Sequence, residues 1–204
     1  MPRTRRTPEP VAPTALQFEI ALDEIEPRIW RRIRIPIDTS MWDLHVAIQD
    51  AMGWTDSHLH EFIVPSSAAE EPVSIGIPTD DDFKPVTAGW EVPVALVFRA
   101  PGDAFTYHYD FGDGWMHTVT LEEVVTGGRP IRKPTCVAGA RACPPEDCGG
   151  YPGYAELLRA LANPKHPEHK DMKAWAPRGF NPEHFDPKAV KFDDPAKRLR
   201  IALE

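Results

Sequence analysis

One stretch of the chain decides the fold: residues 105–121 read FTYHYDFGDGWMHTVTL. On both sides of residues 112–114, large aromatic or aliphatic side chains alternate with smaller or polar ones, which is the pattern of a half-buried strand. The segment between them contains the glycines that tight hairpin turns require. The stretch therefore predicts a long antiparallel hairpin with one aromatic face.

The length of the turn determines which residues pair across this hairpin. A two-residue turn at residues 113–114 pairs Asp110 with His117, which places a carboxylate beside an imidazole but divides the large side chains between two faces. A three-residue turn at residues 112–114 puts them on one face, with these pairs: Phe111 with Trp115, Tyr109 with His117 and Phe105 with Leu121. Because burial of aromatic side chains is strongly stabilising, the sequence favours the three-residue turn.

The residues upstream predict two strands followed by a helix. Apolar residues alternate along residues 16–22, and a second strand covers residues 28–35, so the two form an antiparallel hairpin. Ser40 and Asp43 have the spacing of a capping box, and an apolar stripe runs from there to Gly53, which ends the helix. The order strand, strand, helix resembles the start of ubiquitin-like rolls.

The remainder of the chain predicts more strands in its middle and helices at its end. We expect a third strand at residues 58–64 and a short buried strand at residues 92–98. Prolines recur along residues 65–93, which predicts a surface excursion, and residues 130–153 lack periodicity, which predicts a loop. Short helices are expected in three places: residues 154–161, 166–175 and 195–203.

Together these features predict one α+β domain over residues 15–204, with a mixed or antiparallel sheet, the long aromatic hairpin and C-terminal short helices. Residues 1–14 contain four prolines and few apolar groups, so we expect a disordered tail there. The chain has 23 prolines among its 204 residues, which excludes a helical bundle or coiled coil. We find no internal repeat.

Charge and hydropathy narrow the classes of partner and compartment. The chain has 31 acidic and 23 basic residues, a net charge of −8, and an acidic body disfavours binding to phosphate backbones. No apolar run approaches the ~18 residues of a membrane span, so no membrane partner is expected. Residues 1–14 lack the apolar core of a secretory signal, and the cysteine count is odd. We therefore expect a soluble cytoplasmic protein.

The second strand carries four arginines, and two interpretations are open. They could contact an anion or a nucleic acid, or they could pair across strands with Glu19 and other acids. Charge runs carry little functional information, so the sequence favours cross-strand pairing. The four residues are Arg28, Arg31, Arg32 and Arg34.

The three cysteines, Cys136, Cys143 and Cys148, are candidate metal ligands. Zinc or another divalent cation could bind them, although their spacing is wider than that of most zinc knuckles. A fourth ligand would then come from a distant histidine: His58, His60, His117 or His166. The alternative is that three reduced thiols pack a loop.

Polar side chains gather in two segments that are predicted to be rigid turns. One is the hairpin turn, and the other is the loop CPPEDCGG at residues 143–150. Such loops present carboxylates and imidazoles to a ligand or cation, but turn residues and helix caps have the same composition. The candidate ligand-binding residues are Asp110, Asp113, Trp115, His117, Glu146 and Asp147.

Five ordered motifs resemble the plasmid open-reading-frame-three-like family, which takes its name from an Agrobacterium root-inducing plasmid. Some of its members are labelled resolvase-like passenger proteins of insertion sequences. The resemblance spans residues 15–200, apart from residues 65–93, and implies an α+β domain rather than a particular reaction. The motifs are IEPRIWRR at residues 25–32, LH with AMGW at residues 44–54, SHLHEF at residues 57–62, YDFGDGWMH at residues 109–117 and CPPEDCGG at residues 143–150.

Three functions remain open from the sequence. The preferred one is a binding module whose polar pocket, between the hairpin turn and residues 143–150, takes a small ligand or cation. The second is a metal-assisted hydrolase or nuclease that uses Asp110, Asp113 and His117. The third is a protein or nucleic-acid partner linked to mobile elements, acting through the arginine-rich strand and the basic tail. Motifs for phosphate-binding loops, dinucleotide-binding folds and common hydrolases are absent from the sequence.

Overall fold

A mixed eight-stranded sheet forms the body of the chain in the computed structural model, which describes residues 12–66, 71–80 and 84–204. The strand order is β5-β4-β3-β6-β7-β1-β2-β8. Only β4 and β5 pair in parallel. The strands are β1 Pro13–Leu22, β2 Ile29–Ile35, β3 His60–Val64, β4 Val73–Gly76, β5 Val86–Ala88, β6 Ala104–Tyr109, β7 Trp115–Thr126 and β8 Thr135–Ala140. The α+β class is confirmed.

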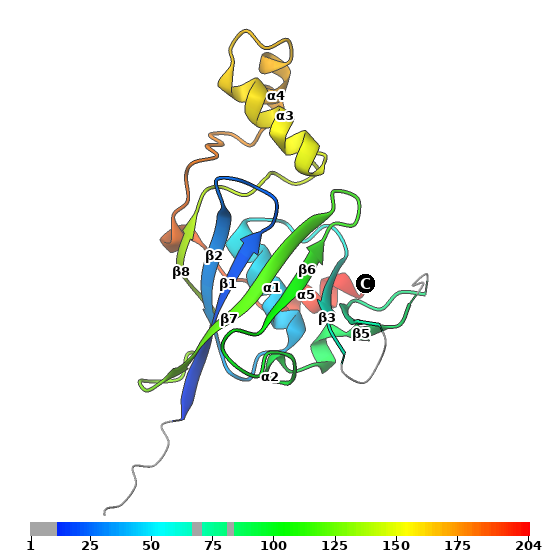
Figure 1. Ribbon diagram of the computed structural model, residues 1–204, viewed down its shortest axis with the longest axis vertical. Coiled ribbons are helices and arrows are strands. Elements are labelled where there is room, and N and C mark those ends of the chain that lie inside the picture. Colours follow the sequence, from blue (N-terminus) through cyan, green and yellow to red (C-terminus); the bar gives the residue numbers. More distant parts are fainter. Residues whose placement is uncertain (1–11, 67–70, 81–83) are drawn as a thin grey trace, which may run out of the picture.

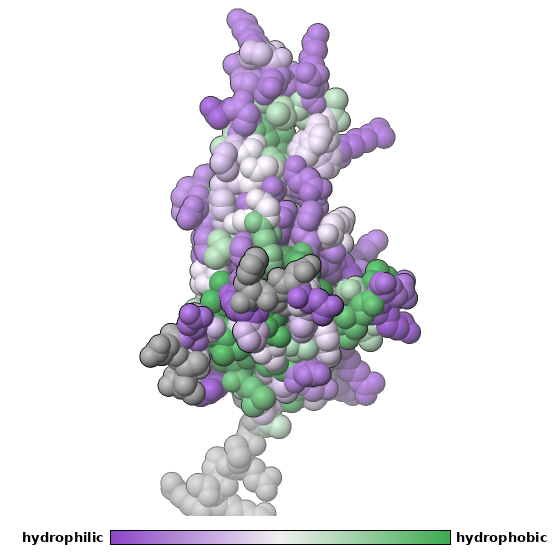
Figure 2. Space-filling view, turned by 90° about the vertical axis from the view of Figure 1, so that its right-hand side faces the viewer, coloured by the Kyte–Doolittle hydropathy of each residue, from purple (hydrophilic) through white to green (hydrophobic). Residues whose placement is uncertain are grey.

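Apart from the short helix at Val94–Val97, the helices occupy two places around the sheet (Figure 1). Helix α1 lies against one face of the sheet with α5 beside it, whereas α3 and α4 form a hairpin beyond one end of the strands. The helices are α1 Met41–Met52, α2 Val94–Val97, α3 Gly150–Ala162, α4 His169–Trp175 and α5 Pro195–Ala202. Figure 2 shows hydrophilic side chains projecting from the α3–α4 end. Within the described part, no helix has the length and apolar character needed to cross a bilayer.

The predicted capping box at the start of α1 is confirmed. The Ser40 hydroxyl accepts a hydrogen bond from the Asp43 amide at 3.1 Å, and the Asp43 carboxylate accepts one from the Ser40 amide at 2.9 Å. Gly53 ends the helix with a φ of 90°, a left-handed conformation that favours glycine. The apolar stripe between them is buried against the sheet.

The predicted register of the aromatic hairpin is wrong by two residues. Tyr109 pairs with Trp115 and Tyr107 with His117, so the turn covers five residues, 110–114. Strand β6 stops at Tyr109 because Asp110 adopts a positive φ of 55° and its carboxylate accepts hydrogen bonds from the amides of the turn. A shift by two residues keeps the side chains that remain in the two strands on their predicted faces, so the expected single buried face is present.

Phe111 is the exception on this hairpin. It lies in the turn rather than in a strand, and it is 51% exposed. Its ring contacts that of His108, with 4.8 Å between the centroids. The four large residues that flank the turn on the buried face, Tyr107, Tyr109, Trp115 and Val119, are fully buried.

Three other local predictions need correction. The buried strand expected at residues 92–98 is instead the short helix α2, which begins after Pro93. The excursion at residues 65–93 contains β4 and β5, and the loop expected at residues 130–153 contains β8. Strand β8 has no apolar alternation of its own because it pairs only with β2, at the edge of the sheet. Residues 1–11, most of the predicted tail, lie outside the described residues, and β1 begins at Pro13.

The predicted cross-strand pairing with acids is confirmed for Arg28 and Arg32, whereas Arg34 bonds to a neutral partner. The Glu19 carboxylate forms an ion pair with Arg28 at 2.6 Å and with Arg32 at 3.4 Å. Arg32 also contacts Glu122 at 2.5 Å, and Arg34 donates to Gln17 at 2.8 Å. The two carboxylates therefore offset the charges of Arg28 and Arg32 on this face of the sheet.

Replacement of Ser40 by alanine removes the side-chain half of the capping box. We expect Ser40→Ala to lower the free energy of unfolding by about 1 kcal/mol, because the Asp43 amide loses its acceptor at the start of α1. Urea denaturation measures the change. Ser40→Thr keeps an oxygen at this position and serves as the control, and an equal loss in both variants would contradict the role of the cap.

A candidate cation site between two turns

Three segments meet at the end of the sheet that faces α3. They are the hairpin turn at residues 110–114, the loop at residues 143–149, named here the Cys-loop, and the loop at residues 54–59. The Asp110 amide donates to the Leu59 carbonyl at 3.0 Å. The Asp113 carboxylate accepts from the Gly149 amide at 3.2 Å, and a Cβ atom on Gly150 would lie 2.5 Å from the Asp113 carbonyl oxygen. The Cys-loop can approach the hairpin this closely only with glycine at position 150.

His58, Asp110 and Asp147 converge at this junction. One ligand atom from each lies within 4.8 Å of the other two. The His58 Nε2 atom is 3.0 Å from Asp147 Oδ1 and 3.7 Å from Asp110 Oδ2. Glu146 Oε2 lies 4.0 Å from the same nitrogen, so three carboxylates surround one imidazole.

Asp110 is held in a fixed orientation by its own turn. Its Oδ1 atom accepts hydrogen bonds from the amides of Gly112 and Asp113 at 2.9 and 3.2 Å. Its Oδ2 atom is the one that faces His58. The residue is only 6% exposed, and its positive φ is a conformation that non-glycine residues rarely adopt. One oxygen therefore anchors the side chain, and the other is presented to the junction.

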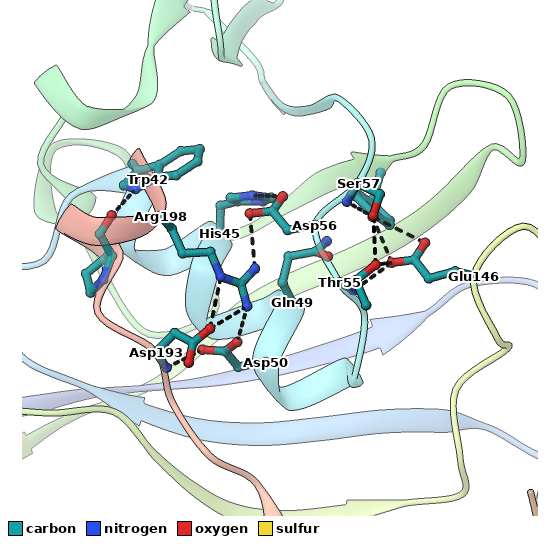
Figure 3. Close-up of polar contacts among 12 residues, drawn as sticks. Trp42, His45, Gln49, Asp50, Thr55, Asp56, Ser57, Glu146, Asp193 and Arg198 are labelled. Carbon is teal, nitrogen blue, oxygen red and sulfur yellow. Dashed lines mark hydrogen bonds and ion pairs between the residues drawn. The ribbon is translucent and has the colours of Figure 1, made fainter. Parts of the chain in front are cut away.

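Glu146 is anchored in the same way, by the loop at residues 54–59. Its Oε1 atom accepts from the Thr55 amide at 2.7 Å and from the Tyr109 hydroxyl at 3.0 Å. Figure 3 shows Glu146 reaching toward Thr55 and Ser57. Burial and the nearby Glu146 carboxylate both raise the pKa of Tyr109, so its hydroxyl stays protonated and donates. Oε2 lies 3.3 Å from the same hydroxyl and is the Glu146 oxygen that approaches His58 Nε2, at 4.0 Å.

Asp147 is the outer member of the group. Its side chain is 72% exposed, whereas those of Asp110 and Glu146 are mostly buried. Its φ of 56° is again left-handed, so two of the three acids occupy strained backbone. The arrangement has a rigid inner part and a side that opens to solvent.

The structure brings together three of the six residues predicted to bind ligand: Asp110, Glu146 and Asp147. Asp113 instead ties the hairpin turn to the Cys-loop. Trp115 is fully buried and packs against the Trp54 and Tyr151 rings, the latter with its centroid at 4.9 Å.

His117 is also fully buried and lies outside the junction. Its Nδ1 atom donates to the Tyr107 carbonyl at 3.2 Å. Neither it nor Asp113 belongs to the groups of three converging ligand atoms among the described residues. The arrangement of Asp110, Asp113 and His117 expected for a hydrolase is therefore not formed.

His58 lies at the centre of this group, a role that was not predicted. From the sequence it was expected only as a possible fourth ligand for the cysteines. The signal that could have identified it is its position in the loop just before β3, next to the strand that carries Tyr109 and leads to Asp110.

The three cysteines have separate surroundings. Cys136 donates to the Ala138 carbonyl, and Cys143 lies 3.2 Å from the Met52 sulfur and 3.6 Å from an Arg31 nitrogen. Burial and then the Asp113 carboxylate raise the pKa of Cys148 to about 12. None of the three belongs to a converging group of ligand atoms within the described residues.

A buried polar network lies behind the junction (Figure 3). His45 Nδ1 is 2.8 Å from the Tyr107 hydroxyl, and its Nε2 atom is 2.8 Å from Asp56. Asp56 in turn accepts from Arg198 of α5 at 3.2 Å. The network connects the sheet, α1, the loop at residues 54–59 and the C-terminal helix.

Comparison with known proteins places the chain in a family. A family model described as plasmid pRiA4b ORF-3-like protein matches residues 14–189. The chain belongs to this family. The uncharacterized protein y4hQ of Sinorhizobium fredii (strain NBRC 101917 / NGR234) is 35% identical over 167 residues, which cover 79% of this chain and 80% of that protein. The resemblance predicted from the five motifs is confirmed.

A solved structure has the same fold as this member of the family. It is the crystal structure of a protein of unknown function, MM3350, from Methanosarcina mazei Go1. The two chains are 36% identical with a TM-score of 0.78, and the match covers 87% of this chain and 98% of the other. The family match includes His58, Asp110, Glu146 and Asp147, and it ends before α5.

The buried His117 predicts a specific pH dependence. Burial lowers its pKa from 6.5 to about 3, so between these values the unfolded chain binds a proton that the folded protein excludes. The contribution of His117 to the free energy of unfolding is therefore complete above about pH 6.5 and is lost as the pH falls below that value. We expect His117→Phe to reduce the slope of unfolding free energy against pH by up to about 1.4 kcal/mol per pH unit between pH 4 and 6.

Urea denaturation at several pH values measures this slope. His184→Gln, which changes an exposed histidine, is the control and should leave the slope unchanged. Parallel profiles for the wild type and His117→Phe would show that His117 does not bind a proton on unfolding in this range.

Proposed function

We propose that this protein is a binding module that holds a divalent cation between His58, Asp110, Glu146 and Asp147. One observation carries the proposal: Asp110 uses Oδ1 for anchoring hydrogen bonds and directs Oδ2 toward His58 Nε2, and Glu146, which is anchored by Thr55 and Tyr109, places Oε2 4.0 Å from the same nitrogen. A ligand set that is oriented before the cation arrives loses little conformational entropy on binding.

The charge and spacing of the group suit a cation. Three carboxylates and one imidazole contribute up to three negative charges, and Asp147, Asp110 and Glu146 have no ion-pair partner other than His58 among the described residues. The separations of 3.0 and 3.7 Å bracket the ~3.3 Å between ligands around a tetrahedral zinc ion with ~2.0 Å bonds. One nitrogen with several carboxylate oxygens favours Zn²⁺ or Mn²⁺ over Ca²⁺, which prefers oxygen alone.

Metal-assisted hydrolysis is the second candidate, and the openness of the site favours it. Catalytic zinc sites keep one position open for water, and the exposed side of Asp147 would allow access to that position. The catalytic centre of such a hydrolase would be the cation bound at His58, instead of the predicted centre formed by Asp110, Asp113 and His117. Nucleic-acid binding has less support, because two of the four arginines, Arg28 and Arg32, are paired with Glu19 and Glu122.

Removal of one inner ligand tests the cation site. We expect the dialysed wild-type protein to bind one Zn²⁺ or Mn²⁺ per chain by isothermal titration calorimetry. We expect Asp110→Asn or His58→Gln to weaken that binding by roughly tenfold or more, because each substitution removes a ligand atom or a charge. Elemental analysis of the titrated protein gives the stoichiometry.

The control for position is His166→Gln. His166 lies with Glu156 and Glu168 in a second group of converging ligand atoms, on α3 and the turn before α4. Loss of binding in His166→Gln but not in His58→Gln would place the cation there. Absence of stoichiometric binding by the wild type would contradict the proposal altogether.

A further inference from the structure

The helical hairpin formed by α3 and α4 contains a cleft that differs in character from the cation site. Its volume is about 420 Å³. Helix α3 contributes Gly153, Glu156 and Leu157, and the segment leading into and along α4 contributes Glu168, Asp171, Met172 and Trp175. The spacings of three, four and seven residues place each set along one side of its helix, so two helical faces line the groove together.

The floor of the cleft is apolar, and an exposed tryptophan, Trp175, lies at its edge. Leu157 is buried beneath it, and Met172 is partly buried. Trp175 is 48% exposed at the C-terminal end of α4. A tryptophan ring with an exposed face beside carboxylates is a favourable surface for an ammonium or guanidinium group, which it attracts through its π electrons.

The rim of the cleft carries negative charge only. Four acidic residues line it and no lysine or arginine does: the acids are Asp147, Glu156, Glu168 and Asp171. Glu156 is paired with Arg159 and His166, and Asp147 with His58. Glu168 and Asp171 have no ion-pair partner among the described side chains, so their charge is available to a ligand. Lys173 of α4 lines a different cleft.

We propose that this cleft is a docking site for a basic segment of a partner protein, in which lysine or arginine side chains alternate with apolar ones. The apolar residues of the segment contact Leu157 and Met172, a cationic side chain lies over Trp175, and other cationic groups pair with Glu168 and Asp171. A groove that combines an apolar floor with an unpaired acidic rim is complementary to a segment that combines both kinds of residue.

A labelled synthetic peptide tests the proposal. The probe is fluorescein-LKLRKLRL, and a second peptide, fluorescein-LELEELEL, has the charges reversed. Fluorescence anisotropy with the full-length protein should show saturable binding of the basic peptide, weakening as salt rises. Trp175→Ala should weaken it about tenfold, as should the double variant Glu168→Gln/Asp171→Asn.

Matched controls separate the cleft from the general acidity of the chain. Glu91→Gln/Glu123→Gln removes two exposed acids elsewhere, and Lys173→Ala changes α4 outside the cleft. Both should bind the basic peptide as the wild type does. Equal weakening in Glu91→Gln/Glu123→Gln, unchanged binding in Trp175→Ala, binding of the acidic peptide, or no binding of the basic one would each overturn the proposal.

The outcome is independent of the cation site, although Asp147 lies beside both. The assay is run in EDTA, and Asp110→Asn is included. Peptide binding that survives both conditions supports the cleft even if no cation binds. Peptide binding that is lost in Asp110→Asn, with circular dichroism unchanged, would assign the peptide to the junction of the turns and overturn the cleft.

Discussion

The buried hydroxyl of Tyr107 constrains the structure around it. It lies in the middle of the aromatic hairpin, fully removed from water, where an unpaired polar group would cost free energy. Its partners are His45 at 2.8 Å and the Gln49 amide nitrogen at 2.9 Å, both on α1. Burial raises the pKa of Tyr107, so the hydroxyl remains a donor to His45. The hairpin and α1 must therefore keep one relative position.

The same constraint continues into the candidate site. The other ring nitrogen of His45, Nε2, lies 2.8 Å from Asp56 Oδ1 and continues the network toward the site. Burial alone would raise the pKa of Asp56, but hydrogen bonds from His45 and Arg198 hold it below its usual range. The residues on either side of Asp56 contact the candidate site. Trp54 donates a hydrogen bond to the Pro144 carbonyl, and Thr55 donates one to Glu146. Ser57 donates to the Tyr109 hydroxyl, and His58 contacts Asp147. One buried network thus orients one short loop, and that loop orients the ligands.

Local patterns predicted much of the fold. The capping box at Ser40, the pairing of the arginine-rich strand and the buried face of the hairpin depend on residues close in sequence or on neighbouring strands. The hairpin register was wrong because the Asp110 carboxylate bonds to its own turn, which ends β6 early, and alternation alone does not reveal this. Strand β8 was missed because an edge strand of small residues needs its partner β2 to define it.

The site was predictable only in part, because local sequence patterns reveal some of its residues and distant contacts position the others. Asp110, Glu146 and Asp147 are recognisable because they lie in glycine- and proline-rich turns. His117 shares the parity of Val119 and Leu121, so its place on the buried face could have excluded it from the site. His58 was harder to assign: its place just before β3 puts it near Asp110, but its orientation depends on the loop that the distant Tyr107 network holds.

The Cys-loop connects the candidate cation site with the α3–α4 cleft, and its backbone conformation leaves it little freedom. Asp147, Gly149 and Gly150 have φ values of 56°, 87° and 65°. A Cβ atom on Gly153 would lie 1.9 Å from the Cys148 carbonyl, so the loop folds directly onto the first turn of α3. Left-handed backbone and close approach together fix the direction in which α3 leaves the sheet. Because Asp147 precedes this turn, its carboxylate sits between the junction at His58 and the α3–α4 cleft, and the charge at one surface contributes to the potential at the other.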